Sequence, residues 1–200
     1  MSTLELKEAK LETDGRKLRA NNSRQKIVDA MLSLVWVGDI APSAENVATT
    51  ANVGLRTVFR RFTDMEVLYR EMIIEVEKKI SSEVFIPFST DQWQQQLIEF
   101  MDRKADIYEK TMPYRVAANF HKHHSTFMKE NLIKWNEFER KILVKIVPAK
   151  VVEDITLFNA LELTLSFDSW LQLRLDQGLT PKQAADTRQK MVNALLTDFN

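Results

Sequence analysis

Cysteine is absent from the 200 residues of the chain, which excludes disulfide bonds, thiolate catalysis and cysteine-based zinc sites. Glycine (4) and proline (5) are scarce, and so few turn-forming residues predict long helices, short connections and few strands. No apolar run approaches the ~18 residues that a membrane-spanning helix requires. The segment from Leu4 to Lys26 is too polar to contain the apolar core of a signal peptide. These absences predict a soluble cytoplasmic protein without a membrane partner.

Positive charge is concentrated near the N-terminus, although the formal net charge of the chain is zero. Between residues 15 and 26 the only charged residues are basic: Arg16, Lys17, Arg19, Arg24 and Lys26. A second basic cluster consists of Arg56, Arg60 and Arg61. A local basic patch on a neutral protein is typical of a DNA-binding module that is attached to another domain.

Apolar residues recur at the spacing of an α-helix along most of the chain, which predicts an all-α fold. We predict about nine helices from this spacing, at residues 23–37, 43–51, 55–62, 64–81, 92–110, 114–120, 125–147, 152–177 and 181–199. Residues 1–20 lack a sustained apolar face and are predicted to form a flexible basic arm, with a transient helix at Leu4 to Leu11. Gly178, Thr180 and Pro181 have the residue types that end one helix, cap the next and open it.

Two of the predicted helices are short and are joined by a turn at Asn52, Val53 and Gly54, which is the layout of a helix-turn-helix. In such a module the second of the two helices enters the major groove of DNA and meets base edges. The outward positions of this helix are predicted to be Leu55, Arg56, Thr57, Phe59, Arg60 and Arg61. Its arginines suit phosphate neutralisation and guanine reading. Charge alone is equally compatible with a solvated surface.

Three runs of residues carry a more specific pattern, and they follow one another in a fixed order. They are Pro42-Ser43-Ala44-Glu45-Asn46-Val47-Ala48, then Ala51-Asn52-Val53-Gly54-Leu55-Arg56-Thr57-Val58-Phe59-Arg60-Arg61-Phe62, then Asp64-Met65-Glu66-Val67-Leu68-Tyr69. This pattern resembles the DNA-binding domain of the TetR family of transcriptional regulators, and the likeness extends from about Ser23 to Ile80. The resemblance implies a DNA-binding domain at 21–80, with the helix-turn-helix at about 43–62. It also implies a helical effector-binding and dimerisation domain at 81–200.

The resemblance also implies particular DNA contacts. Ser43 and Thr57 are expected to donate hydrogen bonds to phosphates, and Phe59 is expected to pack on the DNA backbone. Arg60 and Arg61 are expected to contact phosphates or bases, while Leu55 and Arg56 face the groove. In the N-terminal arm, Arg16, Lys17 and Arg19 either reach DNA or belong to a solubilising tail.

Three positions depart from the family pattern. Asn52 replaces a usual glycine, which is a mild change because asparagine tolerates the same left-handed backbone. Phe59 lacks the tyrosine hydroxyl that commonly meets a phosphate, and Met65 stands where a phosphate-contacting lysine is frequent. Arg56 occupies a position that is usually small and offers a replacement contact.

The predicted helix at 152–177 is apolar nearly all round, which predicts burial on two sides. We predict that a second copy of the chain covers one side, forming a four-helix homodimer interface as the TetR resemblance implies. A purely intramolecular core is the alternative. The predicted interface residues are Leu161, Leu165, Trp170, Leu173, Met191, Leu195 and Phe199.

An effector pocket is implied by the resemblance, for a small apolar or aromatic molecule. Its candidate lining residues are Trp93, Phe100, Met101, Tyr108, Phe120, Phe127, Trp135, Phe138 and Phe167. Mostly apolar walls with a few polar anchors are typical of such pockets. Aromatic residues at helical spacing are also typical of an ordinary core.

His121, His123 and His124 are close in sequence, but their spacing suits a metal site poorly, and a solvated helix end or a pH-sensitive surface is the preferred interpretation. No nucleophile elbow, phosphate loop or HExxH motif is present, so we predict neither an enzyme nor a cofactor. The predicted function is a nucleoid-associated transcriptional repressor that a small effector releases from a palindromic operator. Two alternatives remain: a TetR-like protein controlled by a protein partner, and an all-helical enzyme or scaffold with an incidental helix-turn-helix.

Overall fold

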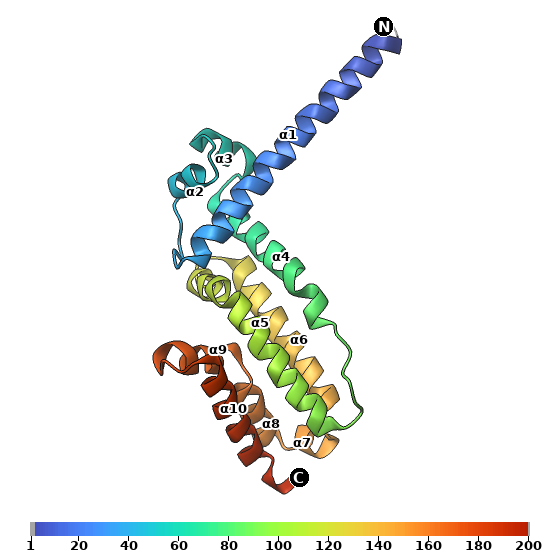
Figure 1. The fold of residues 1–200 in the computed structure, drawn as a ribbon, viewed down its shortest axis with the longest axis vertical. Helices are drawn as coiled ribbons and strands as arrows, with labels where there is room; N and C mark the ends of the chain where they lie inside the picture. Colours follow the sequence, from blue (N-terminus) through green and yellow to red (C-terminus); the bar gives the residue numbers. More distant parts are fainter. Residues whose placement is uncertain (1–2, 200) are drawn as a thin grey trace. The chain divides into compact units, whose positions relative to one another are not determined.

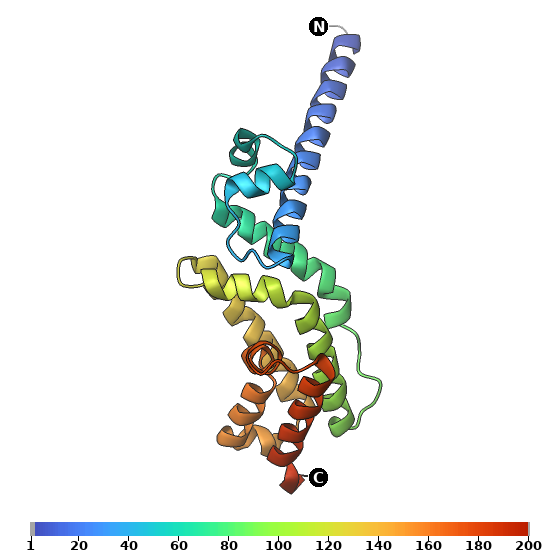
Figure 2. The same cartoon turned by 60° about the vertical axis from the view of Figure 1, so that its left-hand side comes forward.

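The structure is a computed structural model that describes residues 3–199; the side chains of residues 3–19 and of Asp198 lie outside the described part. Over residues 3–199 the chain forms helices and no strand, so the predicted all-α class is confirmed (Figures 1 and 2). The elements are α1 (Thr3–Trp36), α2 (Ala44–Thr50), α3 (Leu55–Arg61), α4 (Met65–Val84), α5 (Trp93–His121), α6 (Thr126–Ile146), α7 (Ala149–Glu153), α8 (Ile155–Thr164), α9 (Phe167–Leu171), the π-helical η1 (Gln172–Asp176), α10 (Pro181–Leu195) and the 3₁₀ turn η2 (Thr197–Phe199). None of the helices in this range combines the length and the apolar content that crossing a membrane requires.

The chain divides into two compact units. The first contains the residues up to Glu77 together with Pro113–Ser125, and the second contains Lys78–Met112 together with the residues from Thr126 onward. The boundaries therefore fall within α4 and within α5. The sequence had assigned residues 113–125 to the C-terminal domain, whereas in the structure they pack with the first unit.

The core of the first unit lies between α1 and the helices that follow it. Its buried side chains include Ile27, Met31, Val35, Val47, Ala48, Val58, Phe62, Leu68 and Met72. Helices α2 and α3 pack against each other and against α1 (Figures 1 and 2). Because Val58 and Phe62 point into this core, the opposite face of α3 points outward, as the sequence predicted.

Helix α1 begins earlier than the sequence predicted. The backbone is helical from Thr3, so the predicted start near Asn22 or Ser23 is wrong. Good helix formers dominate residues 3–20, and the single Gly15 costs only about 1 kcal/mol relative to alanine. Residues 3–20 therefore form a helix without an apolar face, because the helix propensity of these residues is sufficient.

The turn between α2 and α3 depends on the left-handed backbone of Asn52, whose φ is 52°. The Val53 amide donates to the Ala48 carbonyl (3.0 Å) and the Asn52 amide donates to the Thr49 carbonyl (3.1 Å). These two bonds form a Schellman motif that ends α2. Gly54 then precedes α3 as its N-cap, as predicted from the sequence.

Substitution of Asn52 tests this turn. Asn52→Val is expected to destabilise the chain by about 1–2 kcal/mol, because the left-handed conformation is costly for a side chain with a branched Cβ. Asn52→Gly is expected to match or exceed wild-type stability. The free energy of unfolding in urea measures both effects. Thr50→Val, at an exposed helical position of α2, is the matched control and is expected to change stability by less than about 0.5 kcal/mol.

The core of the second unit is formed by side chains from five helices, α5 to α8 and α10. Its members include Leu97, Phe100, Met101, Leu143, Ile146, Val147, Val151, Phe158, Leu161, Leu165, Val192 and Leu196. Helix α8 lies beside α10, and Lys104 of α5 reaches Glu139 of α6 (Figures 1 and 2). Apolar residues from distant parts of the sequence therefore meet in one core.

The prediction of one helix at 152–177 is wrong, because two side-chain caps divide this segment. Asp154 accepts a hydrogen bond from the Leu157 amide (3.0 Å) and begins α8. Ser166 accepts one from the Ser169 amide (3.1 Å) and begins α9. Such local hydrogen bonds compete with a continuous helix. Because the divided segment changes direction, its apolar side chains can be buried on several sides within the same chain.

The break predicted at Pro113 is also wrong, because α5 continues through this residue to His121. Proline lacks the amide hydrogen of a helical bond and costs ~3 kcal/mol inside a helix. Packing on both sides offsets this cost: Tyr108 is buried in the second unit, and Ala117 is buried in the first.

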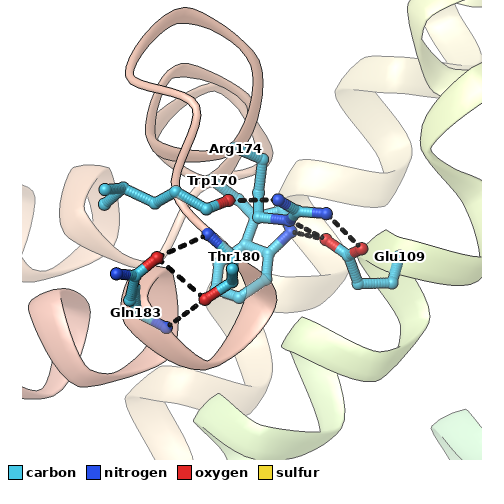
Figure 3. A network of polar contacts seen from close by, with 6 residues as sticks. Glu109, Trp170, Arg174, Thr180 and Gln183 are labelled. Carbon is cyan, nitrogen blue, oxygen red and sulfur yellow. Dashed lines mark hydrogen bonds and ion pairs between the residues drawn. The ribbon is translucent and has the colours of Figure 1, made fainter.

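A polar network in the second unit joins α5 to α9 and η1 (Figure 3). Glu109 accepts hydrogen bonds from Trp170 Nε1 (2.8 Å), Arg174 Nε (2.7 Å) and Arg174 Nη2 (3.0 Å). Arg174 Nη1 also donates to the Leu179 carbonyl. Burial alone would raise the pKa of Glu109, but the hydrogen bonds from Arg174 and Trp170 and the charge of Arg174 hold this pKa below its usual value.

The start of α10 follows the sequence prediction. Gly178 has a φ of +65°, Thr180 is the N-cap, and Pro181 is the first helical residue. Thr180 and Gln183 exchange hydrogen bonds in a capping box, which is also visible in Figure 3.

The lowered pKa of Glu109 predicts a pH-dependent contribution to stability. Because the folded pKa lies below the unfolded one, the contribution is fully present above the unfolded pKa of about 4.3 and is lost as the pH falls through the folded pKa. Glu109→Gln is therefore expected to destabilise the chain at pH 7, with the difference from wild type shrinking below about pH 4. Urea unfolding across pH measures this. Glu130→Gln, at an exposed carboxylate of α6, is the control, and an equal pH profile for the two variants would contradict the prediction.

Candidate nucleic-acid interface and ligand pocket

The outward face of α3 carries basic and large apolar side chains together. Leu55 is 38% exposed and Phe59 is 49% exposed, and Arg56 and Arg60 on the same helix are exposed as well. Within the described part of the chain, neither arginine has a hydrogen bond or an ion pair, and α3 contains no acidic residue. This surface can offer cations to phosphates and apolar groups to base edges.

Arg24 holds the C-terminal end of α3 in place. Its Nη1 donates to the Arg61 carbonyl (2.8 Å), its Nη2 pairs with Glu71 Oε1 (2.9 Å), and its guanidinium carbon lies 4.3 Å from the centre of the Phe62 ring. One side chain of α1 therefore contacts the end of α3 and a residue of α4. The sequence had counted Arg24 only as part of a basic cluster, and its role as a positioning residue was missed.

Removal of the Arg24 guanidinium is expected to loosen α3. Arg24→Gln should destabilise the chain by about 1–2 kcal/mol, since it removes a hydrogen bond, a partly exposed ion pair and a cation–π contact. Urea unfolding measures the loss. Lys26→Gln removes a neighbouring exposed cation of the same helix and should change stability by less than about 0.5 kcal/mol. Equal effects of the two substitutions would show that Arg24 does not support α3.

The remaining predicted DNA contacts differ in their surroundings. Ser43 is exposed, and its hydroxyl oxygen caps α2 while its hydrogen stays available for donation. Thr57 is half-buried. Arg61 is also half-buried, and its Nε is buried without a hydrogen-bond acceptor among the described residues. The side chains of Arg16, Lys17 and Arg19 lie outside the described residues.

The end of α5 and the loop after it contact the start of α4 and the loop between α1 and α2, within the first unit. The rings of Tyr69 and His121 lie 4.1 Å apart between centres. The Tyr69 hydroxyl donates to the Ile40 carbonyl (3.3 Å), and His121 Nε2 lies 3.2 Å from the same oxygen. Ser125 Oγ donates to Glu66 at the start of α4 (2.9 Å). The sequence gave no signal for this packing, because the residues that α5 and the following loop contact are 52–81 positions away in the chain.

The three neighbouring histidines do not share one environment. His121 is half-buried in the contact just described, whereas His123 and His124 are exposed. Among the described residues, no group of three or more histidine, aspartate or glutamate side chains is arranged to hold a metal ion.

A pocket of about 490 Å³ lies in the second unit, and its walls come from three segments. Helix α5 contributes Gln96, Phe100, Arg103, Lys104, Ile107 and Tyr108. Helix α6 contributes Trp135, Phe138, Glu139, Ile142, Lys145 and Ile146. The third wall is Val84 to Phe88, at and after the end of α4. The spacing of three or four residues along α5 and α6 places each set on one helical face.

One side of the pocket contains a buried ion pair. Lys104 Nζ lies 2.7 Å from Glu139 Oε2, and both side chains are almost completely buried. The Tyr108 hydroxyl lies 3.0 Å from the same carboxylate oxygen and 3.3 Å from the Leu165 carbonyl. Buried charges require such partners. This arrangement supplies a rigid polar anchor beside the aromatic side chains of the pocket.

Four of the predicted pocket residues line this pocket: Phe100, Tyr108, Trp135 and Phe138. The structure places Trp93, Met101, Phe120, Phe127 and Phe167 elsewhere. Met101 and Phe167 are buried in the second unit, and Trp93 packs against its core. Phe120 is exposed in the first unit. Helical periodicity alone could not distinguish a core position from a pocket wall.

The segment after α4 was missed as a pocket wall. Phe85 and Ile86 are exposed, and Phe85 lies edge-on to Phe138 with ring centres 5.8 Å apart. The signal that could have indicated this role is the apolar run from Val84 to Phe88, interrupted by proline and so unable to form a helical stripe.

Four of the predicted dimer residues are unavailable to a second copy of the chain. Leu161, Leu165, Trp170 and Leu173 are buried within the second unit, so their assignment to an interface is wrong. The predicted continuous helix would have exposed a second apolar face, which the bends after Glu153 and Thr164 remove. Met191 is exposed, and Leu195 and Phe199 are half-buried. Large apolar side chains that the sequence missed, Ile155, Leu163 and Leu175, are also exposed in this region.

Comparisons of the chain with protein-family models, with curated proteins and with solved structures found no match. What bears on the function is therefore the chain's own sequence pattern, the outward face of α3 and the pocket between α5 and α6.

Proposed function

We propose that this chain is a DNA-binding transcriptional regulator of the TetR type. The sequence pattern from Pro42 to Tyr69 supports the family, and the outward face of α3 carries the functional part of the proposal. A helix of seven residues leaves Leu55 and Phe59 exposed beside two unpaired arginines, although its opposite face is firmly packed. Such a surface favours an external ligand with phosphates and apolar base edges.

In this proposal α3 enters the major groove of duplex DNA. Arg56 and Arg60 contact phosphates or guanines, and Leu55 and Phe59 contact thymine methyl groups or the sugar backbone. The hydrogen bond between Arg24 and the Arg61 carbonyl restricts the motion of α3 in the absence of DNA. Less conformational entropy is therefore lost when α3 binds.

The proposal assigns the pocket between α5 and α6 to an effector that releases the repressor from DNA. An effector can act only through different affinities for the DNA-binding state and another state. Helix α4 supplies Leu68 and Met72 to the core of the first unit and Val84 to the pocket wall, so it is the element through which we expect the change to pass. The chain is proposed to act as a homodimer on a palindromic operator, with Leu163 and Met191 among the exposed apolar contacts.

Selection from random duplexes tests the DNA-binding part. The purified chain is expected to enrich an inverted repeat whose half-sites are about one helical turn apart, as expected for a two-fold symmetric pair of reading helices. Recovery of unrelated sequences after repeated rounds would contradict the proposal.

A further inference from the structure

The charges around the pocket are unequal. Its lining includes Arg103, Lys104 and Lys145, whereas Glu139 is the single carboxylate among the described residues that line it. Glu139 is already engaged by Lys104 and Tyr108. Its negative charge is therefore compensated within the wall, and among the residues that line the pocket two cations remain in excess.

Several N–H groups of the Arg103 guanidinium have no hydrogen-bond acceptor among the described residues. Its Nη1 donates to the Ile86 carbonyl, and its guanidinium carbon lies 5.0 Å from the centre of the Phe88 ring. A guanidinium has five N–H groups, and no further acceptor for them is found in the described chain. The nearby Glu99, which does not line the pocket, accepts hydrogen bonds from Ser89 at both carboxylate oxygens, and its negative charge offsets part of the positive charge of Arg103.

Lys145 provides the second excess cation, from the opposite wall. It lies on α6, is exposed, and has no ion-pair partner in the part of the chain that the structure describes. Arg103 and Lys145 thus offer positive charge from both helices that enclose the pocket. An anionic group is the complement of this pair.

Apart from Gln96, the rest of the pocket lining is aromatic or apolar. Phe138 lies 5.8 Å from the ring centre of Trp135 and 5.8 Å from that of Phe85, and Phe100 and Ile107 line the facing helix. Aromatic faces also attract cations, but the excess of positive side chains opposes a cationic ligand. The volume of about 490 Å³ suits a molecule with a sizeable apolar body.

We infer that the pocket binds an amphipathic monocarboxylate, with its carboxylate at Arg103 and Lys145 and its alkyl body among the aromatic side chains. This inference deepens the proposed function, because it rests on that function for the assignment of the pocket as an effector site. The binding step itself requires no DNA.

Calorimetry of the full chain with octanoate, decanoate, 1-octanol and decyltrimethylammonium tests the inference. Decanoate is expected to bind about 15-fold more tightly than octanoate, because two more methylene groups are buried. It should also bind at least tenfold more tightly than decyltrimethylammonium. Arg103→Gln is expected to weaken decanoate binding about 10- to 100-fold, since a charge-assisted hydrogen bond is lost, and to change 1-octanol binding by less than about threefold.

Two controls separate the carboxylate contact from the bond between Arg103 and Ile86. Arg103→Lys retains a cation and should recover most of the decanoate affinity, and Lys182→Gln removes an exposed cation of α10 that does not line the pocket. Equal weakening of decanoate and 1-octanol by Arg103→Gln would overturn the inference, as would tighter binding of the cationic amphiphile. The calorimetry contains no duplex, so it tests the inference separately from DNA binding. If the chain binds decanoate but enriches no duplex, the proposed function is contradicted and the inference stands. If the chain enriches a duplex but does not bind decanoate, the inference is contradicted and the proposed function stands.

Discussion

The double variant Arg56→Gln/Arg60→Gln is expected to bind its selected duplex at least about 100-fold more weakly than wild type. A base-reading arginine is worth about 1–3 kcal/mol, and each phosphate contact adds about 1 to the slope of log affinity against log salt. The two side chains are exposed and have no partner in the described chain, so the fold should survive their loss. Fluorescence anisotropy with labelled duplex across a salt series measures both affinity and slope.

Lys134→Gln/Lys141→Gln is the matched control for this experiment. It removes the same charge from exposed positions of α6 and should leave the affinity within about threefold and the salt slope unchanged. If the α3 variant kept wild-type affinity and slope, α3 would not be the DNA-reading element. If both variants weakened binding equally, general electrostatic attraction would replace the specific contact.

Trp170→Ala is expected to cause the largest loss of stability, about 3–5 kcal/mol, because it deletes a fully buried indole. The same substitution removes a hydrogen-bond donor from Glu109 and the aromatic face against Arg188, whose guanidinium carbon lies 4.6 Å from the ring centre. Arg188 is itself 0% exposed, and its Nε and Nη1 have no hydrogen-bond acceptor in the described chain. Loss of the indole would leave this buried cation with the Met101 carbonyl as its hydrogen-bond acceptor.

Urea unfolding followed by circular dichroism measures this loss. Trp170→Phe retains much of the packing but not the hydrogen bond to Glu109, so about 1–3 kcal/mol is expected to be lost. Leu175→Ala, at an exposed position in η1, should lie within about 0.5 kcal/mol of wild type. A Trp170→Ala variant as stable as the Leu175→Ala variant would show that the indole is not a structural centre of the second unit.

Local patterns in the sequence were sufficient for α2, α3 and the turn between them. The residue types at Asn52, Gly54 and Ser43 specify a left-handed turn and two N-caps, and these depend only on neighbouring backbone groups. The inward direction of Val58 and Phe62 follows from helical periodicity for the same reason. The start of α10 at Thr180 was predicted in this way too.

Predictions that required knowledge of distant contacts were less successful. Asp154 and Ser166 divide the segment that the sequence predicted as one helix. Their side-chain caps can end a helix only if the residues after each cap can pack against other parts of the chain. The chain's own folding then buries Leu161 and Trp170, which the sequence assigned to a second copy. For the same reason, periodicity identified aromatic positions on α5 and α6 but could not say which of them line the pocket.

The contacts of Arg24 and His121 show what kind of information the sequence lacks. Arg24 approaches Glu71 and the end of α3, and His121 approaches Ile40, across separations of 37 to 81 residues. No spacing rule links residues so far apart. Arg24 was accordingly assigned to a charge cluster, and His121 to a solvated helix end, when both support the first unit.

The absence of cysteine makes a direct test of the central claim possible, because one introduced cysteine is unique. Leu55→Cys at the start of α3 and Lys182→Cys on α10 would each carry the same photoreactive crosslinker, and each protein would be irradiated with the selected duplex. The account predicts crosslinks from position 55 to defined bases in each half-site and only background from position 182. A duplex that the chain binds, but that position 55 fails to crosslink above that background, would contradict the claim that α3 reads DNA.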